Sequence, residues 1–131
     1  MYLFKTSGTT FQSVIHNQKH AYRGIPKEIK PGELILVSKN KGDCVSGEKQ
    51  IQYTMRYVGA RVANDSEIAT LWPGNPGRWN WIIDCEETKP LSTPFNLGEV
   101  IGKYRYKHYR NVMTFSKLLK EDAQKVETFI H

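Results

Sequence analysis

The side chains best suited to chemistry in this chain are aromatic rings that stand beside glycine and proline. All 3 tryptophans lie between positions 71 and 84, Trp72 directly precedes a Pro-Gly pair, and Tyr22 precedes another turn-rich segment at 23–26. Rings carried by loops can stack on both faces of a flat heterocycle. We therefore expect Tyr22 and Trp72 to bind a nucleobase, although each ring could instead anchor its loop by partial burial.

Polar side chains follow the first predicted strand and could identify such a base by its edge. One ammonium and three hydroxyl groups lie there, on Lys5, Thr6, Ser7 and Thr9. These groups can donate or accept the hydrogen bonds that a base edge requires. Thr9 has an alternative role as the cap of a following helix.

Positive charge is the second chemical feature of the chain. The 19 Lys and Arg outnumber the 13 Asp and Glu, which gives a net charge of +6 and favours polyanionic partners. If residues 103–110 are extended, alternate basic residues share one face and the tyrosines share the other. That face could follow phosphates, or it could be a solvated edge whose tyrosines pack on the core. The predicted phosphate contacts are Lys39, Lys41, Arg78, Lys103, Arg105, Lys107 and Arg110.

The sequence contains only incomplete versions of the residue sets that are typical of catalysis or metal binding. His16 and His20 have the spacing of two zinc ligands on a helix, but the sequence marks no third ligand. Asp84 and Glu86 fit an ion-paired strand end better than an acid–base pair. The sequence contains no nucleophile elbow and no phosphate-binding glycine loop. We therefore predict that the chain is not an enzyme and uses no metal or cofactor.

Cysteine usage and hydropathy bear on the compartment. Cys44 and Cys85 belong to no paired motif, which favours free thiols and a cytoplasmic location. Apolar runs are far shorter than the roughly 20 residues of a membrane helix, so we expect no membrane partner.

Strands in the middle of the chain and helices near its ends must position these side chains. Strands are predicted at residues 2–4, 33–39 and 50–62 and around Trp81. Helices are predicted at 11–18, 97–101 and 116–130, with a loop at 20–26 and a break at 64–66. This order predicts one α+β domain over residues 1–131, built on a strongly bent mixed sheet or small barrel flanked by helices.

The order of these features resembles that of the PUA-like superfamily, and within it the chain is most similar to YTH and EVE domains. Tyr22-Arg23-Gly24-Ile25-Pro26 resembles the segment with the first cage aromatic of YTH domains, which have Trp where this chain has Tyr22. Leu71-Trp72-Pro73-Gly74 resembles the segment with the second, and Trp79-Asn80-Trp81-Ile82 resembles the strand that follows. The resemblance implies a base between Tyr22 and Trp72, edge contacts from residues 5–7, and a third wall from 73–79, which we assign to Trp79.

The function implied by this resemblance is that of a non-catalytic reader of a methylated base, flipped from DNA in preference to RNA. EVE-like modules resemble the targeting parts of modification-dependent restriction systems, which implies a nuclease or NTPase effector as a partner. The alternatives are an RNA-binding module that reads N6-methyladenine and a small PUA-like hydrolase with a Lys, Thr and Glu set.

Overall fold

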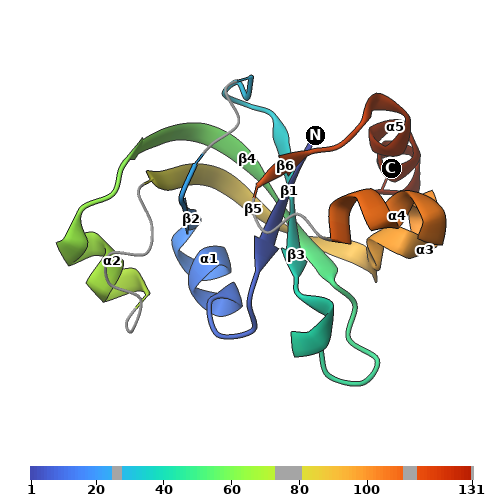
Figure 1. Ribbon diagram of the computed structural model, residues 1–131, viewed down its shortest axis with the longest axis horizontal. Helices are drawn as coiled ribbons and strands as arrows, with labels where there is room; N and C mark the ends of the chain where they lie inside the picture. Colours follow the sequence, from blue (N-terminus) through green and yellow to red (C-terminus); the bar gives the residue numbers. More distant parts are fainter. Residues whose placement is uncertain (25–27, 73–80, 111–114, 131) are drawn as a thin grey trace.

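The computed structural model describes residues 1–24, 28–72, 81–110 and 115–130 (Figure 1). Within these residues, six strands form one sheet in the order β2-β5-β4-β3-β1-β6. The strands are β1 (Tyr2–Thr6), β2 (Lys19–Tyr22), β3 (Leu34–Lys39), β4 (Ile51–Val62), β5 (Trp81–Phe95) and β6 (Ser116–Lys117). β1 pairs with β3 in parallel and with β6 antiparallel, so the sheet is mixed.

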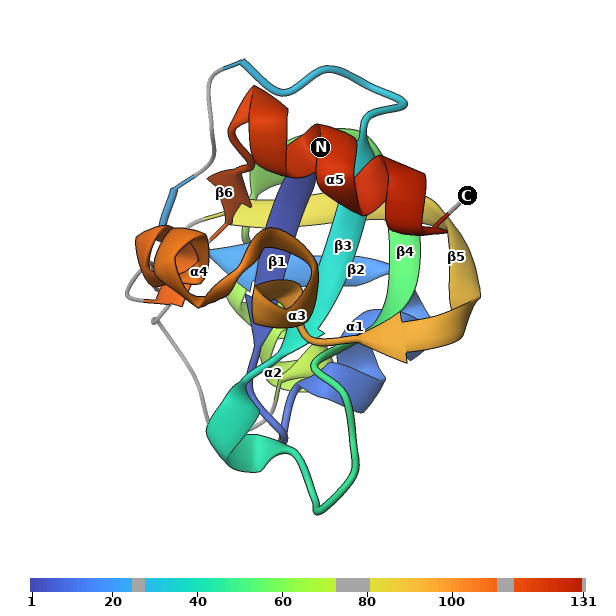
Figure 2. The ribbon, with the colours of Figure 1, turned by 90° about the vertical axis from the view of Figure 1, so that its right-hand side faces the viewer.

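Helices cover the sheet in two groups. The α-helices are α1 (Phe11–Asn17), α2 (Asp65–Leu71), α3 (Leu97–Ile101), α4 (Lys103–Arg110) and α5 (Lys120–Ile130), with a 3-10 turn η1 (Lys41–Asp43). Helices α1 and α2 lie on one side of the molecule and α3, α4 and α5 on the other, in front of β1, β3 and β4 (Figures 1 and 2). This arrangement confirms the predicted α+β class. No helix among the described residues is long and apolar enough to cross a membrane.

The two longest strands give the sheet its bend. β4 and β5 pair antiparallel with three shifts of register, at Ile51/Tyr53, Thr54/Arg56 and Tyr57/Gly59. Irregular pairing of this kind bends a strand and increases its twist. The first shift also places Ile51 in a different core cluster from Met55 and Tyr57, although simple alternation predicts one shared face.

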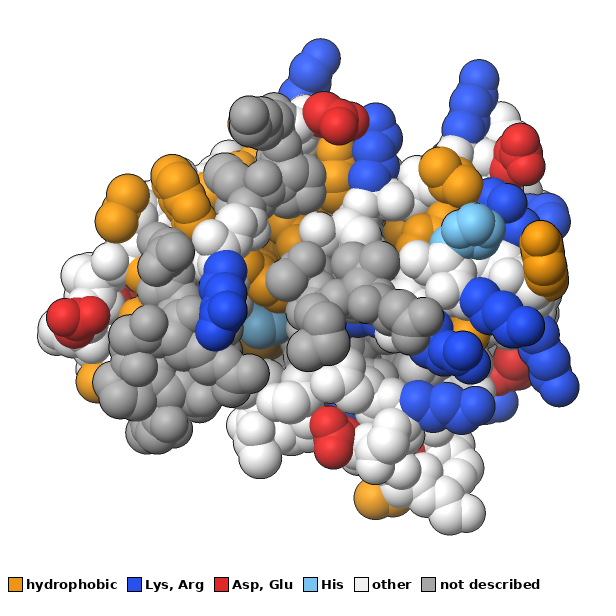
Figure 3. Space-filling view, viewed as in Figure 1, with side chains coloured by type: hydrophobic (Ala, Val, Ile, Leu, Met, Phe, Trp, Pro, Cys, Tyr) orange, Lys and Arg blue, Asp and Glu red, His pale blue; other side chains and the backbone are white. Residues whose placement is uncertain are grey.

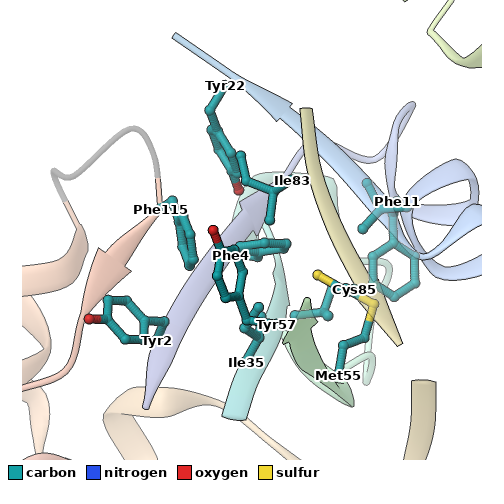
Figure 4. Close-up of a cluster of buried hydrophobic side chains, with 12 residues drawn as sticks. Tyr2, Phe4, Phe11, Tyr22, Ile35, Met55, Tyr57, Ile83, Cys85 and Phe115 are labelled. Carbon is teal, nitrogen blue, oxygen red and sulfur yellow. The ribbon is translucent and has the colours of Figure 1, made fainter. Parts of the chain in front are cut away.

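The side chains of β1 alternate between two core clusters, one on each face of the sheet. Tyr2 and Phe4 enter a core cluster closed by α1 and β2 (Figure 4), while Leu3 enters a second cluster under α3, α4 and α5. Side chains that alternate between the two faces of a strand produce this division. A third cluster packs α2 against β2 and β5 through Ala21, Ile68, Trp72 and Ile82.

Two predicted segments adopt another structure. Residues 20–22 belong to strand β2 instead of a loop, because the whole of β2 pairs with Trp81–Asp84 of β5. Residues 103–110 form helix α4 instead of an extended strip. On a helix, Arg105 and Tyr109 are one turn apart, and both contact the buried carboxylate of Asp122 in α5. This long-range contact is incompatible with the predicted strand.

One helix is missing from the prediction, and another begins later than predicted. The break at 64–66 is the start of α2, where the Asn64 side chain accepts a hydrogen bond from the backbone N–H of Glu67 at 2.8 Å. The closing helix begins at Lys120, because Ser116 pairs with Leu3 in the short strand β6.

Candidate functional site

A row of rings crosses the edge of the sheet where β2 meets α2. The imidazole of His20 lies 4.3 Å from the phenol of Tyr22 and 6.4 Å from the indole of Trp72, measured between ring centroids. The planes of His20 and Trp72 are inclined by only 25°. We call these two near-parallel rings the His20–Trp72 pair.

Helix α2 positions one member of this pair. Trp72 directly follows α2, and its backbone N–H donates to the carbonyl of Ile68 at 2.8 Å. The indole then packs with Ala21 and Ile82 in the third core cluster. Ser13 of α1 donates to the carbonyl of Leu71 at 2.9 Å, which ties the end of α2 to a second helix.

Ion pairs hold α2 against the sheet. Arg61 of β4 contacts Asp84 of β5 at 2.9 Å through Nε, and its terminal nitrogens contact Glu67 of α2. Lys19 of β2 reaches the other oxygen of Asp84 at 2.7 Å. Asp84 is therefore ion-paired, as the sequence indicates, although it lies within β5 and not at its end, and the network fixes the helix that precedes Trp72.

Tyr22 does not form an open wall opposite Trp72, which corrects the predicted cage. The phenol is only 4% exposed and points into the first core cluster, between Phe4 and Phe115 (Figure 4). Its hydroxyl donates to the carbonyl of Lys5 at 3.2 Å. Because β2 is a strand, alternation directs His20 and Tyr22 inward together, and His20 takes the position facing Trp72.

His20 is a candidate site residue that the sequence marks only as a possible metal ligand. Its Nδ1 accepts from the backbone N–H of Ala21 at 2.8 Å, so the ring proton lies on Nε2, which donates to the carbonyl of Lys5 at 3.1 Å. Burial opposes protonation and lowers the pKa of His20 to about 4. The imidazole is therefore neutral at pH 7. His16 and His20 do not form a ligand pair, because α1 ends at Asn17 and His16 is exposed.

The carbonyl of Lys5 joins β1 to β2, although these strands are not neighbours in the sheet. It accepts from both His20 and Tyr22, so side chains close the gap between the two strands. The Lys5 ammonium donates at 2.9 Å to the carbonyl of Arg110, the last residue of α4. Burial lowers the pKa of Lys5. Lys5 thus connects the ring cluster to α4.

The predicted base-edge groups now divide into two kinds. Thr6 is 1% exposed and its hydroxyl donates to the carbonyl of Ser38, so its side chain is not available to a ligand. Ser7 shares hydrogen bonds with the hydroxyls of Thr9 at 3.0 Å and Thr10 at 2.9 Å. Lys5, Ser7 and Thr9 keep a donor or acceptor near the molecular surface, and their role in base reading stays a prediction.

Helix α4 arranges the predicted phosphate contacts differently from a strand. Lys103, Lys107 and Arg110 follow helical spacing and lie on one exposed face, which we call the α4 cationic face. Figure 3 shows Lys and Arg side chains gathered over this part of the molecule. Arg105 turns inward and pairs with Asp122 at 3.2 Å, so it is removed from the predicted phosphate set.

The other predicted phosphate contacts are less uniform. Lys39 pairs with Glu48 at 3.0 Å and its side chain is only 15% exposed, so it is a weak phosphate ligand. Lys41 is exposed in η1. This 3-10 turn lies beside the turn that follows β1, since the Asp43 carboxylate accepts a hydrogen bond from the backbone N–H of Gly8. Arg78 and Trp79 lie outside the described residues.

A groove elsewhere on the surface has the wrong chemistry for a polyanion. It lies between α3 and α5, encloses about 720 Å³, and includes Glu99, Glu121 and Phe129 in its walls. Among the described residues, two carboxylates and one lysine line it, so it does not favour phosphate. No group of three or more His, Cys, Asp and Glu side chains is arranged for a metal ion in the part of the chain that the structure describes.

Solved structures share this fold at low sequence identity. The ASCH protein of Zymomonas mobilis superposes with a TM-score of 0.69 at 11% identity, covering 99% of this chain and 95% of that chain. Human THYN1, in complex with 5-methylcytosine-containing DNA, gives a TM-score of 0.61 at 13% identity, covering 99% and 96%. A Pseudomonas syringae protein gives 0.63 at 11% identity, covering 99% of both chains. The chain therefore has a PUA-like fold.

No protein-family model matches the chain, and no curated protein matches it.

Proposed function

We propose that this chain binds nucleic acid and holds one modified base in the His20–Trp72 pair, as a non-catalytic reader related to EVE and YTH domains. The observation that carries the proposal is the geometry of these two rings. A base stacked between two rings separates them by about 7 Å, because each stacking step takes about 3.4 Å. The observed centroid distance of 6.4 Å and inclination of 25° are those of a directly packed aromatic pair, so the two rings already have the orientation for stacking and must move apart to admit a base.

Phosphate binding beside the ring pair supports the same proposal. The α4 cationic face ends at Arg110, and Lys5 joins that residue to the carbonyl that holds His20. A strand bound along α4 would therefore run toward the ring pair. Phosphate contacts set the position of a nucleic acid, and base contacts give specificity. The two regions of this site are suited to these separate tasks.

The burial of the ring pair favours a modified base as the ligand. Trp72 is 2% exposed and His20 is 4% exposed, so a base enters only if side chains covering the rings move aside. Stacking on the rings would contribute roughly 1–3 kcal/mol, against a few kcal/mol needed to flip a base from a duplex. A methyl group is apolar and adds no hydrogen-bonding group that a dry site must satisfy. We therefore favour a methylated base.

DNA is the ligand that we propose, because THYN1, which has the same fold, has been solved in complex with 5-methylcytosine-containing DNA. A reader without catalysis acts through a second protein. We accordingly propose a nuclease or NTPase effector as that partner, in the manner of modification-dependent restriction.

A binding titration tests this proposal. Labelled DNA and RNA strands of one sequence, unmodified or carrying 5-methylcytosine or N6-methyladenine, are titrated with the full chain and followed by fluorescence anisotropy. We expect tighter binding to one modified strand. Trp72→Leu, which keeps an apolar side chain but has no π face, should lose this preference, and Trp72→Phe should retain part of it. Equal affinity for all strands would disprove the reader role.

A hydrolase is the second candidate, and one observation favours it. Burial lowers the pKa of Lys5, and a lysine with a lowered pKa is a better base or nucleophile than an ordinary one. The pure chain would then hydrolyse acylated nucleosides, and Lys5→Met would abolish the activity. We favour binding, because the Lys5 ammonium is already engaged by the carbonyl of Arg110.

A further inference from the structure

Tyr104 is the most exposed large hydrophobic side chain among the described residues. It is 77% exposed, although it lies on a helix that is packed against α3 and α5. No hydrogen bond or ring contact holds its phenol within the described residues. Tyr106 and Tyr109 on the same helix are bonded instead, to Gln50 and to Asp122. Packing therefore does not account for the aromatic ring at position 104.

The neighbours of Tyr104 on α4 are cations and a second ring. At 100° per residue, Tyr104 and His108 lie one above the other, directly beside the stripe formed by Lys103, Lys107 and Arg110. His108 is exposed as well. Arg105 and Tyr109 occupy the opposite side, toward α5. The outer surface of α4 thus consists of a row of positive charges and a parallel row of rings.

We propose that Tyr104 is a stacking platform for an unpaired base of the nucleic acid whose phosphates lie on the α4 cationic face. This inference rests on the proposed function and extends it to the nucleotides that flank the modified base. An exposed ring beside a cationic track binds single strands, because each unpaired base offers a π face and each phosphate a charge. Paired bases in a duplex do not expose that face. The partner we assign is therefore a single-stranded segment.

The position of the platform on α4 relates it to Arg110, the end of the helix nearest to Lys5. Tyr104 precedes Arg110 by six residues, which is about 9 Å along the helix axis. Arg110 is the residue that Lys5 contacts. We therefore place the base on Tyr104 on the same strand as the captured base, on the far side of the phosphate at Arg110.

An abasic scan tests the platform. Single strands with one modified base are prepared with an abasic nucleotide at each flanking position in turn, and their affinity for the full chain is measured by anisotropy. With the natural chain, one position should lose about 5- to 150-fold in affinity, the range expected for one stacked base. With Tyr104→Ala this loss should already be present on the intact strand, and the abasic nucleotide should add nothing. Tyr104→Phe should behave as the natural chain.

Three outcomes overturn the inference. In the first, Tyr104→Ala keeps the natural sensitivity at every abasic position. In the second, it weakens duplex and single strand equally. In the third, the natural chain binds no single strand. Failure of the reader role is distinct, because modified and unmodified strands would then bind equally while the abasic effect at Tyr104 persists. Folding is not in question, since substitutions at such an exposed side chain change stability by about 0.5 kcal/mol or less.

Discussion

The ring pair and the outer surface of α4 carry the same kinds of side chain in opposite environments. Trp72 is 2% exposed and His20 is neutral and bonded on both nitrogens, whereas Tyr104 is 77% exposed beside the exposed lysines of α4. In a buried site, a polar group without a hydrogen-bond partner is strongly destabilising, so such a site can discriminate between bases. An exposed cationic surface accepts any phosphate. The comparison separates specificity at one region from affinity at the other.

Changing Trp72 should produce the largest effect, because this residue serves both the core and the proposed site. Trp72→Ala removes a buried indole from the third core cluster and should lower the free energy of unfolding by about 3–5 kcal/mol. Urea denaturation measures the loss. Tyr104→Ala is the matched control on α4 and should change stability by about 0.5 kcal/mol or less. An equal loss in the free energy of unfolding for the two variants would contradict the assignment of Trp72 as a buried ring and Tyr104 as an exposed one.

Acid should weaken the buried region next. The pKa of His20 is about 4 in the folded chain, against about 6.5 for a free histidine, so below pH 6.5 the unfolded chain binds the proton first. Stability from this residue is therefore full above pH 6.5 and is lost as the pH falls toward 4. The loss should reach about 3 kcal/mol. Denaturation at a series of pH values should show this slope in the natural chain and not in His20→Gln.

Acid should weaken the contacts between Asp122 and α4 less than it weakens the buried region around His20. The reason is that the Arg105 side chain, which pairs with Asp122, is partly exposed to water. Burial opposes ionisation of Asp122, but hydrogen bonds from Tyr109 and Arg105 outweigh it and lower the pKa of the carboxyl. This stabilisation is full above about pH 4 and is lost as the pH falls below that value. Asp122→Asn should cost about 1.5–3 kcal/mol at pH 7, the value of hydrogen bonds to a charged group.

A binding assay decides what the Asp122 anchor does for function. If α4 is positioned by Asp122, then Asp122→Asn should weaken binding to modified and unmodified strands by the same factor. A selective loss for the modified strand would instead place α4 in base reading. The measurement thus asks whether the two regions act independently.

The elements built from local patterns were predictable from the sequence. Helix α1 follows the spacing of Phe11 and Val14, and strands β3 and β4 occupy the apolar runs near 33–39 and 50–62. Each of these patterns repeats with the period of its own element and buries one face. The α+β class followed from their order along the chain.

The site was predictable only in part, because long-range pairing decides it. The alternating tyrosines of 103–110 also fit a helix, and the choice depends on Asp122, which lies 13 residues beyond Tyr109. Tyr22 was expected on a loop, but pairing with Trp81 makes it part of a strand and turns its ring inward. That same pairing brings His20 to Trp72. The sequence signal for β2 was the alternation of rings in residues 19–22, where His20 and Tyr22 are separated by Ala21.

The smallest expected effect concerns single cations on the α4 face. Lys107 is exposed and lies between Lys103 and Arg110, so its loss removes about one phosphate contact and leaves the core intact. For single strands, Lys107→Ala should reduce the slope of log K against log[salt] by about 0.7, with the same change for modified and unmodified strands. Lys30→Ala is the control of equal charge, because Lys30 precedes β3 at the opposite end of β1 from Lys5. An unchanged slope in Lys107→Ala, or an equal change in Lys30→Ala, would show that binding follows net charge and that α4 holds no defined phosphate.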